Sequence, residues 1–238
     1  MTPLPELPDA ERLEQPAKTF RLVMIEKDPL SPTIGEKGKL LVIEWIEGLT
    51  NPPGLRKLTH ATIPAYIISA EIVNTAFIRS MKYGNRFNDK TQGAWYCAFE
   101  HDVAVEEISY HHKRRQIHTD GYSGVSIFRE IFADFTGTFR DARGLPRGKG
   151  ILGTETDMAY PHGQKLARKL REEGARGIIY PSVRDPKERP CLAAFHKEIV
   201  QNARFGDLWK IRWDKEGKFS KNKMEEEQPF LRNLWGET

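Results

Sequence analysis

The chain has 238 residues, of which 39% are hydrophobic and 29% are charged. This composition is ordinary for a globular protein with a buried core, and it excludes a wholly disordered or collagen-like chain. The net charge of +4 arises from 37 basic and 33 acidic residues, so charge alone gives little support for a nucleic-acid partner.

The sequence carries no signal for a membrane or for secretion. Its longest apolar stretches are far too short for a transmembrane helix, and residues 1–8 lack the basic and apolar blocks of a secretory signal. Cys97 and Cys191 each lie in an apolar, strand-like run, which favours reduced core thiols over a disulfide or a metal site. We therefore expect a cytosolic protein without a bound metal.

The N-terminal part of the chain begins with residues 1–18, which are rich in proline and charge and are expected to be partly disordered. A first strand is expected at 20–25, and a second strand-like run follows at 40–46. The apolar residues between 63 and 79 fit a helix or a strand equally well.

The middle of the chain is expected to mix strands and helices. Residues 93–99 read as a short buried strand, and Asp102 can cap the helix that follows it. We expect an amphipathic helix at 126–132, followed by a strand at 135–139 where apolar and polar residues alternate.

The clearest helix signal lies at 161–173. Proline suits the first turn of a helix, and Gly174 can end the helix in the left-handed conformation. The buried stripe of this helix is expected to consist of Leu166, Ala167 and Leu170.

Two buried strands are expected after this helix, at 177–180 and 191–195, and residues 215–238 read as a charged tail. Strands and helices do not alternate regularly along the chain, which disfavours a doubly wound parallel sheet and favours a mixed α+β fold.

Arg86 lies between the turn formers Gly84 and Asn88, so its side chain is expected to leave a bend in the chain. A guanidinium there can hold a phosphate through two hydrogen bonds, but a surface arginine paired with a nearby carboxylate is the simpler interpretation. Tyr96 is either a core tyrosine or a ring that stacks on a flat heteroaromatic group.

Glu106 and Glu107 open a helix, where the helix dipole favours carboxylates. They point about 100° apart, so only one can share a pocket with Arg86. An ionised carboxylate beside a ribose would bind its hydroxyl groups and stabilise positive charge at the anomeric carbon. Ser182 follows a buried strand without a nucleophile elbow, so it is a turn residue or it positions a phosphate or sugar hydroxyl.

The order and spacing of five segments resemble the RES domain family, which is named for its Arg, Glu and Ser. The resemblance covers residues 83–195, roughly half of the chain. The five segments are Gly84-Asn85-Arg86-Phe87-Asn88, Trp95-Tyr96-Cys97-Ala98, Ala104-Val105-Glu106-Glu107, Gln164-Lys165-Leu166-Ala167, and Gly177-Ile178-Ile179-Tyr180-Pro181-Ser182 followed by Cys191-Leu192-Ala193-Ala194-Phe195.

The resemblance implies a mixed fold similar to that of ADP-ribosyltransferases, with a central split β-sheet flanked by helices. It also implies NAD as the substrate. Members of the family are toxins of toxin-antitoxin pairs that deplete NAD by phosphorolysis, with phosphate as co-substrate, or by hydrolysis. A helix-turn-helix antitoxin neutralises them and is their indirect link to nucleic acid. Some members instead transfer ADP-ribose to a protein.

By the same resemblance, the catalytic residues are Arg86, Glu107 and Ser182, and the Ala-x-x-Glu spacing of the family selects Glu107 over Glu106. The residues that the resemblance assigns to NAD are Arg86, Tyr96, Ser182 and Arg79. The early arginine of the family corresponds to either Arg21 or Arg79.

The resemblance suggests a catalytic domain at 61–214, after an N-terminal extension at 1–60 and before the charged tail at 215–238. The leading hypothesis is an enzyme of the NAD phosphorylase or NAD glycohydrolase type. The alternatives are an ADP-ribosyltransferase that modifies a protein and a non-catalytic binding module.

Overall fold

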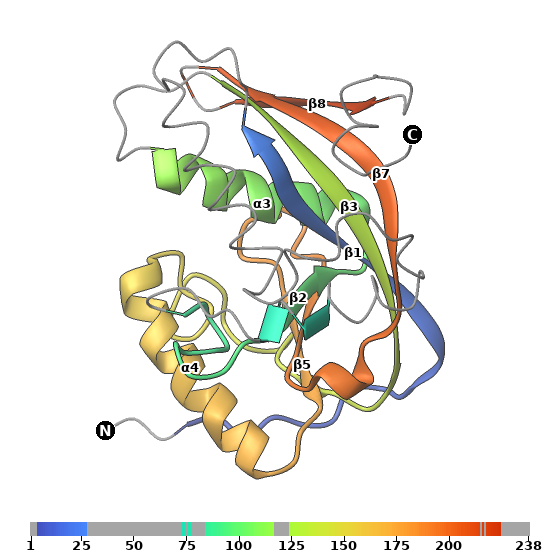
Figure 1. Ribbon diagram of the computed structural model, residues 1–238. Helices are drawn as coiled ribbons and strands as arrows, with labels where there is room; N and C mark the ends of the chain where they lie inside the picture. The colour runs from blue at the N-terminus through green and yellow to red at the C-terminus, as the bar shows by residue number, and fades with distance from the viewer. Residues whose placement is uncertain are drawn as a thin grey trace. The chain divides into compact units, whose positions relative to one another are not determined.

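The structure is a computed structural model that describes residues 4–27, 73–74, 76–77, 84–116, 124–214, 216 and 218–224 (Figure 1). The strand expected at 40–46 and the candidate Arg79 lie outside these residues. The chain divides into two compact units. The first takes its described residues from 4–21, 76–108 and 132–203, and the second takes them from 22–74, 109–131 and 204–224.

Strands and helices are mixed along the described part of the chain, as expected. The elements are β1 (Leu13–Lys27), β2 (Trp95–Ala98), α3 (His101–Gln116), β3 (Gly124–Gly137), β4 (Arg140–Asp141), α4 (Thr156–Glu172), β5 (Gly177–Pro181), β6 (Pro190–Ala194), the 3-10 helix η2 (Lys197–Ile199), β7 (Gln201–Trp213) and β8 (Phe219–Met224).

The described strands hydrogen-bond in the order β4-β5-β6-β2-β1-β3-β7-β8. The sheet is mixed because β4 pairs with β5 in parallel, whereas β2 with β6 and β5 with β6 are antiparallel. This arrangement confirms the α+β fold class.

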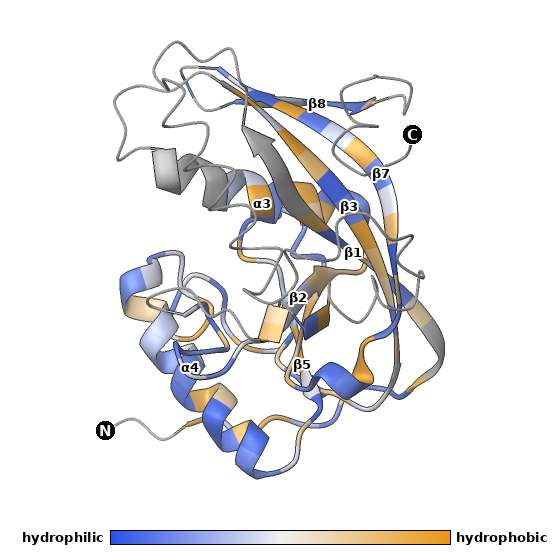
Figure 2. Ribbon diagram, viewed as in Figure 1, coloured by the Kyte–Doolittle hydropathy of each residue, from blue (hydrophilic) through white to orange (hydrophobic). Residues whose placement is uncertain are grey.

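The core of the first unit lies between one face of β5, β6 and β2 and the helix α4. The strand register sets Tyr96 opposite Ala193 and Tyr180 opposite Cys191, so all four side chains lie on the same face of the sheet. The predicted stripe of α4 packs against this face, and each of its three residues is at most 2% exposed. Figure 2 shows the matching alternation of apolar and hydrophilic segments along α4.

The helix α4 begins at Thr156, five residues before the expected start, so Pro161 lies inside it. Proline there removes one intrahelical hydrogen bond but does not end the helix. The predicted end is confirmed, because Gly174 has φ of 77°. The N–H of Gly174 donates to the carbonyl of Arg171 at 3.0 Å, and the N–H of Ala175 donates to Leu170 at 2.9 Å, which is a Schellman ending.

The helix expected at 126–132 is wrong, because these residues belong to strand β3. Two polar residues, Ser126 and Glu130, are fully or almost fully buried on β3, at 0% and 3% exposure. Their burial hides the period of two in the sequence, because an alternating strand normally shows apolar residues at its buried positions. Asp102 also differs slightly from expectation, since it lies in the first turn of α3 and not at its cap.

The N-terminal segment is ordered earlier than the expected strand start at residue 20. The N–H of Ala10 donates to the carbonyl of Phe139 at 2.7 Å, and the N–H of Asp141 donates to Pro8 at 2.8 Å. Strand β1 then starts at Leu13. At the other end of the described chain, β8 lies within the segment that the sequence suggested as a charged tail.

Candidate functional site

A tight turn at residues 84–88 directs Arg86 into the first unit. The N–H of Asn85 donates to the carbonyl of Asn88 at 2.8 Å, and Gly84 adopts φ of 69°. A Cβ on Gly84 would lie 2.2 Å from that carbonyl, so glycine is required there. The bend predicted around Arg86 is therefore present, but its side chain is only 7% exposed and is not a surface arginine.

Tyr96 fastens this turn to the sheet. Its hydroxyl accepts the N–H of Phe87 at 2.8 Å and donates to Asn88 Oδ1 at 2.9 Å. Burial raises the pKa of Tyr96 well above its ordinary value, so the phenol stays neutral and can donate. The hydroxyl thus has the partners that a buried tyrosine needs, and it fixes the backbone from which Arg86 leaves.

The guanidinium of Arg86 holds the segment that precedes α4. Its Nη1 donates to the carbonyl of Ile151, and its Nη2 donates to the carbonyl of Gly153 at 3.1 Å. The ring of Tyr160 lies 5.5 Å from the guanidinium carbon, within cation–π range. A phosphate bound by Arg86 would have to share or replace these two carbonyl partners.

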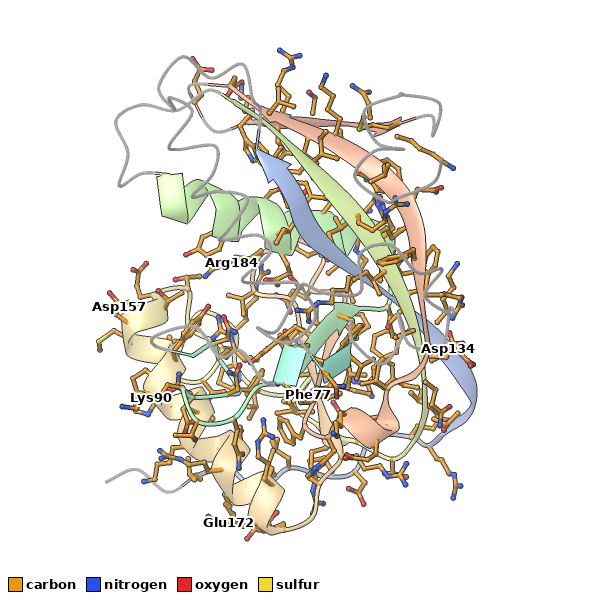
Figure 3. All side chains as sticks on the ribbon, viewed as in Figure 1. Phe77, Lys90, Asp134, Asp157, Glu172 and Arg184 are labelled. Atoms are coloured by element: carbon orange, nitrogen blue, oxygen red, sulfur yellow. The ribbon has the colours of Figure 1, made fainter. Side chains whose placement is uncertain are left out.

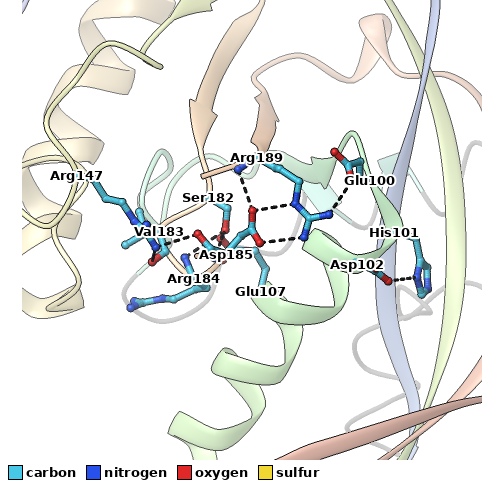
Figure 4. Close-up of polar contacts among 10 residues, drawn as sticks. All are labelled: Glu100, His101, Asp102, Glu107, Arg147, Ser182, Val183, Arg184, Asp185 and Arg189. Atoms are coloured by element: carbon cyan, nitrogen blue, oxygen red, sulfur yellow. Dashed lines mark hydrogen bonds and ion pairs between the residues drawn. The ribbon is translucent and has the colours of Figure 1, made fainter. Parts of the chain in front are cut away.

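Glu107 and Ser182 meet directly, from α3 and from the residue after β5 (Figure 4). Ser182 Oγ donates to Glu107 Oε1 at 2.5 Å. The same oxygen accepts the N–H of Arg184 at 3.2 Å and the N–H of Asp185 at 3.0 Å. The hydroxyl is fully engaged and completely buried, so Ser182 orients the carboxylate and is not arranged as a nucleophile.

The protonation of Glu107 is set by opposing influences. Burial raises its pKa above the ordinary value. The hydrogen bond from Ser182 and the positive charges of Arg184 and Arg86 act in the other direction and favour the ionised form. Of the two adjacent acids that the sequence left open, Glu107 is the one that meets Ser182.

The contacts that fix this turn were not predictable from the sequence. Asp185 is 1% exposed and accepts from Arg189 Nε at 3.0 Å and Nη2 at 2.9 Å. Arg189 Nη1 also donates to Glu100, the residue before α3, at 2.7 Å. Arg189 holds the pKa of Asp185 down at about 2. These bonds join the turn of Ser182 to the start of the helix that carries Glu107.

Arg184 is a second residue that the sequence did not single out. Its Nη2 donates to the carbonyl of Thr154 at 2.9 Å, and its side chain is only partly buried. The spacing from Ser182 was the available signal, because a residue two positions after a turn serine readily donates its N–H to the serine oxygen.

Arg21, one of the two arginines proposed from the resemblance, lies on the other face of the sheet from the Tyr96 side chain. Phe20 pairs with Ala98, so Phe20 shares the face of Tyr96, and Arg21 points to the opposite side. Its guanidinium lies 4.9 Å from the centre of the Trp95 ring and donates to the backbone carbonyl of Tyr96 at 3.2 Å. Arg21 is therefore not part of the cluster around Glu107.

A surface hollow of about 350 Å³ lies elsewhere in the first unit, and none of the predicted site residues that the structure describes lines it. Its lining includes the acids Asp9 and Glu173 and the bases Arg12, Arg140 and Arg176. Arg140 is paired with both acids, at 2.9 Å and 3.6 Å. This mixture of charges does not favour an anionic ligand.

Residues 61–214 match the family model described as RES domain. The matched range contains Arg86, Tyr96, Glu107 and Ser182, as well as Arg184 and Asp185. A search of curated proteins found no match to the chain. Within the described residues, no helix is both long enough and apolar enough to cross a membrane, and no three side chains of the metal-binding types form a group that could hold a metal ion.

Proposed function

This chain belongs to the RES domain family, and from that premise we propose that it is an enzyme that consumes NAD by breaking the bond between nicotinamide and ribose. The observation that carries the proposal is the Glu107 carboxylate, which is held by Ser182 Oγ at 2.5 Å and lies within the influence of two guanidinium groups. Such a carboxylate suits a reaction that develops positive charge on a sugar.

The chemistry requires little acid catalysis. In NAD the nicotinamide nitrogen already carries a positive charge, so the electron pair of the C1′–N bond leaves with nicotinamide and neutralises it. The ribose C1′ then becomes electron-poor, and an ionised Glu107 next to it would lower the energy of that state. The protein mainly contributes orientation and a fixed negative charge.

An oxygen nucleophile completes the reaction. Hydrogen phosphate would form an O–C1′ bond and give ADP-ribose phosphorylated at that carbon, and water would give ADP-ribose and release one proton to solvent. Both routes produce one nicotinamide for each NAD consumed. Phosphorolysis and hydrolysis therefore differ only in the acceptor, and a single site can support either.

The other site residues have complementary roles in this proposal. Arg86 binds the anionic part of NAD, and the Tyr96 ring stacks on nicotinamide. The hydrogen bonds of Tyr96 to Phe87 and Asn88 support a positioning role for the turn that carries Arg86. Ser182 holds Glu107 in one orientation and favours its ionised form.

We further propose, on family grounds, that the protein is the toxin of a toxin-antitoxin pair with a helix-turn-helix protein as its partner. Expression of the wild-type chain should arrest growth and lower cellular NAD, whereas the Glu107→Gln chain should do neither. Growth arrest by both chains would separate toxicity from NAD consumption and contradict the toxin proposal.

The enzymatic proposal is tested by incubating the purified protein with NAD labelled in its adenylate part, with and without inorganic phosphate. Release of nicotinamide supports the proposal, and the sugar product identifies phosphate or water as acceptor. Label attached to an added cell protein would identify a protein acceptor. Intact NAD after incubation with correctly folded wild-type protein would refute NAD cleavage.

A further inference from the structure

Arg184 is tied by its backbone to the hydroxyl that holds Glu107. Its N–H donates to Ser182 Oγ at 3.2 Å, and that oxygen donates to Glu107 Oε1 at 2.5 Å. The turn therefore fixes where the Arg184 side chain starts relative to the carboxylate. Its positive charge favours the ionised form of Glu107, and it lowers the pKa of Glu107 more than the charge of Arg86 does.

The two arginines near Glu107 differ in their access to solvent. Arg86 is 7% exposed, and both terminal nitrogens of its guanidinium donate to backbone carbonyls. Arg184 is only partly buried, and its side chain donates to the carbonyl of Thr154, an exposed residue. Figure 3 shows Arg184 near the end of the unit where α4 begins. A ligand from solvent can reach Arg184 with less rearrangement than Arg86.

Both arginines contact one short segment, residues 151–154, through its carbonyl groups. Arg86 takes the carbonyls of Ile151 and Gly153, and Arg184 takes that of Thr154. A neutral carbonyl is a weaker partner for a guanidinium than a phosphate, which accepts two charge-assisted hydrogen bonds. At an exposed position, a phosphate can therefore displace the carbonyl of Thr154.

We propose that Arg184 binds a phosphate group beside the Glu107 carboxylate and releases the Thr154 carbonyl when it does so. The proposal deepens the proposed function and rests on it. A phosphate next to a carboxylate is repelled unless a cation lies between or beside them, and Arg184 supplies that cation. The phosphate belongs either to the NAD diphosphate or to the free phosphate that attacks C1′.

Kinetics of Arg184→Gln and Arg184→Lys distinguish these two sources. If Arg184 binds free phosphate, the KM for phosphate in Arg184→Gln should rise by about tenfold or more while the KM for NAD stays unchanged. If it binds the NAD diphosphate, the KM for NAD should rise by a similar factor with and without phosphate. Arg184→Lys should recover part of the loss, because it keeps the charge without the guanidinium fork.

The matched control is Arg143→Gln, which removes the same charge from an exposed arginine paired with Asp141. It should leave both KM values within about twofold of wild type. If Arg184→Gln also leaves both KM values unchanged, or lowers only kcat, Arg184 does not bind phosphate and the proposal is wrong.

A binding measurement keeps this test separate from the proposed function, because it needs no turnover. The folded wild-type, Arg184→Gln and Arg143→Gln proteins are titrated calorimetrically with inorganic phosphate and with ADP, the second as a diphosphate probe. Weaker binding of either probe to Arg184→Gln alone supports the proposal even if NAD is not cleaved. Equal binding by all three proteins, or binding of neither probe to the wild type, overturns it.

Discussion

The hydroxyl of Ser182 has all its hydrogen-bonding capacity in use. It donates to Glu107 and accepts two backbone N–H groups, from Arg184 and Asp185. Donation to a carboxylate stabilises the ionised form and lowers the pKa of the acid. Ser182 therefore opposes the effect of burial, which raises the pKa of Glu107.

Replacing Ser182 with alanine should move the acidic limb of the activity profile to higher pH. The variant loses a hydrogen bond that favours ionised Glu107, so a larger fraction of the enzyme is protonated and inactive at any given acidic pH. The check is kcat for NAD cleavage between about pH 5 and pH 9.

Ser220→Ala, at an exposed serine of β8, is the control and should leave the acidic limb in place. The Ser182 variant should also lose about 1–3 kcal/mol of stability, because the buried N–H of Asp185 and the partly buried N–H of Arg184 lose their acceptor. An acidic limb at the wild-type position would show that Ser182 does not set the ionisation of Glu107.

At the scale of elements, α4 packs closely against the turn that carries Arg86, and the closest approach is at Gly163. A Cβ on Gly163 would lie 2.3 Å from the carbonyl oxygen of Arg86 and 3.1 Å from its Cγ. Only glycine allows this approach. The sequence predicted both α4 and the turn that carries Arg86. It did not predict the contact at Gly163 that brings them together.

Gly163→Ala separates helix propensity from packing. An exposed helix would gain about 1 kcal/mol from this change, whereas the contact with Arg86 predicts a loss of about 1–3 kcal/mol. The midpoint of urea unfolding should decrease, and NAD cleavage should fall with it. Gly144→Ala, where a Cβ would meet nothing within 4 Å, serves as the control. A gain in stability for Gly163→Ala would contradict the close approach.

The loop between β5 and β6 is held by Asp185, Arg189 and Glu100. Asp185 has its pKa lowered from the ordinary 3.8 to about 2, first of all by its side-chain hydrogen bond with Arg189. A lowered pKa in the folded state contributes stability that is fully present above the unfolded value and is lost as pH falls toward the folded value. The window for this contribution is between about pH 4 and pH 2.

Asp185→Asn should be less stable than the wild type above about pH 4, and the difference should shrink as the pH approaches 2. Urea midpoints measured across this range provide the test. Asp157→Asn, at an exposed position of α4, should show a much smaller difference at every pH. A difference between wild type and Asp185→Asn that does not change with pH would mean that the ion pair is not its source.

Local sequence patterns predicted the elements whose buried residues are apolar. The stripe of α4, the glycine that ends it, and strands β5 and β6 follow directly from such patterns. Strand β3 did not, because its buried Ser126 and Glu130 break the pattern. The site that the sequence assigns to Arg86, Tyr96, Glu107 and Ser182 stays a prediction, and the structure brings Glu107 and Ser182 into contact. The carbonyl partners of Arg86 were not predictable, because backbone acceptors far along the chain leave no trace in side-chain spacing.

At the scale of the whole molecule, family membership supports the kind of reaction proposed, and the geometry supports the proposed roles of individual residues. The match over residues 61–214 identifies the family. The contacts between Ser182, Glu107 and Arg184 suggest how the site would work. The net charge of +4 points only weakly toward an anionic partner, and the cations whose charge acts on Glu107 are Arg184 and Arg86.

The most direct test of the central claim compares wild type and Glu107→Gln in the same NAD solution, followed by proton NMR. Glutamine keeps an oxygen that can accept from Ser182 but removes the charge that burial disfavours, so the thermal midpoint should equal or exceed that of the wild type. We expect free nicotinamide to accumulate with the wild type and at least about 100-fold more slowly with Glu107→Gln. Equal rates of nicotinamide release by the two folded proteins would contradict the account.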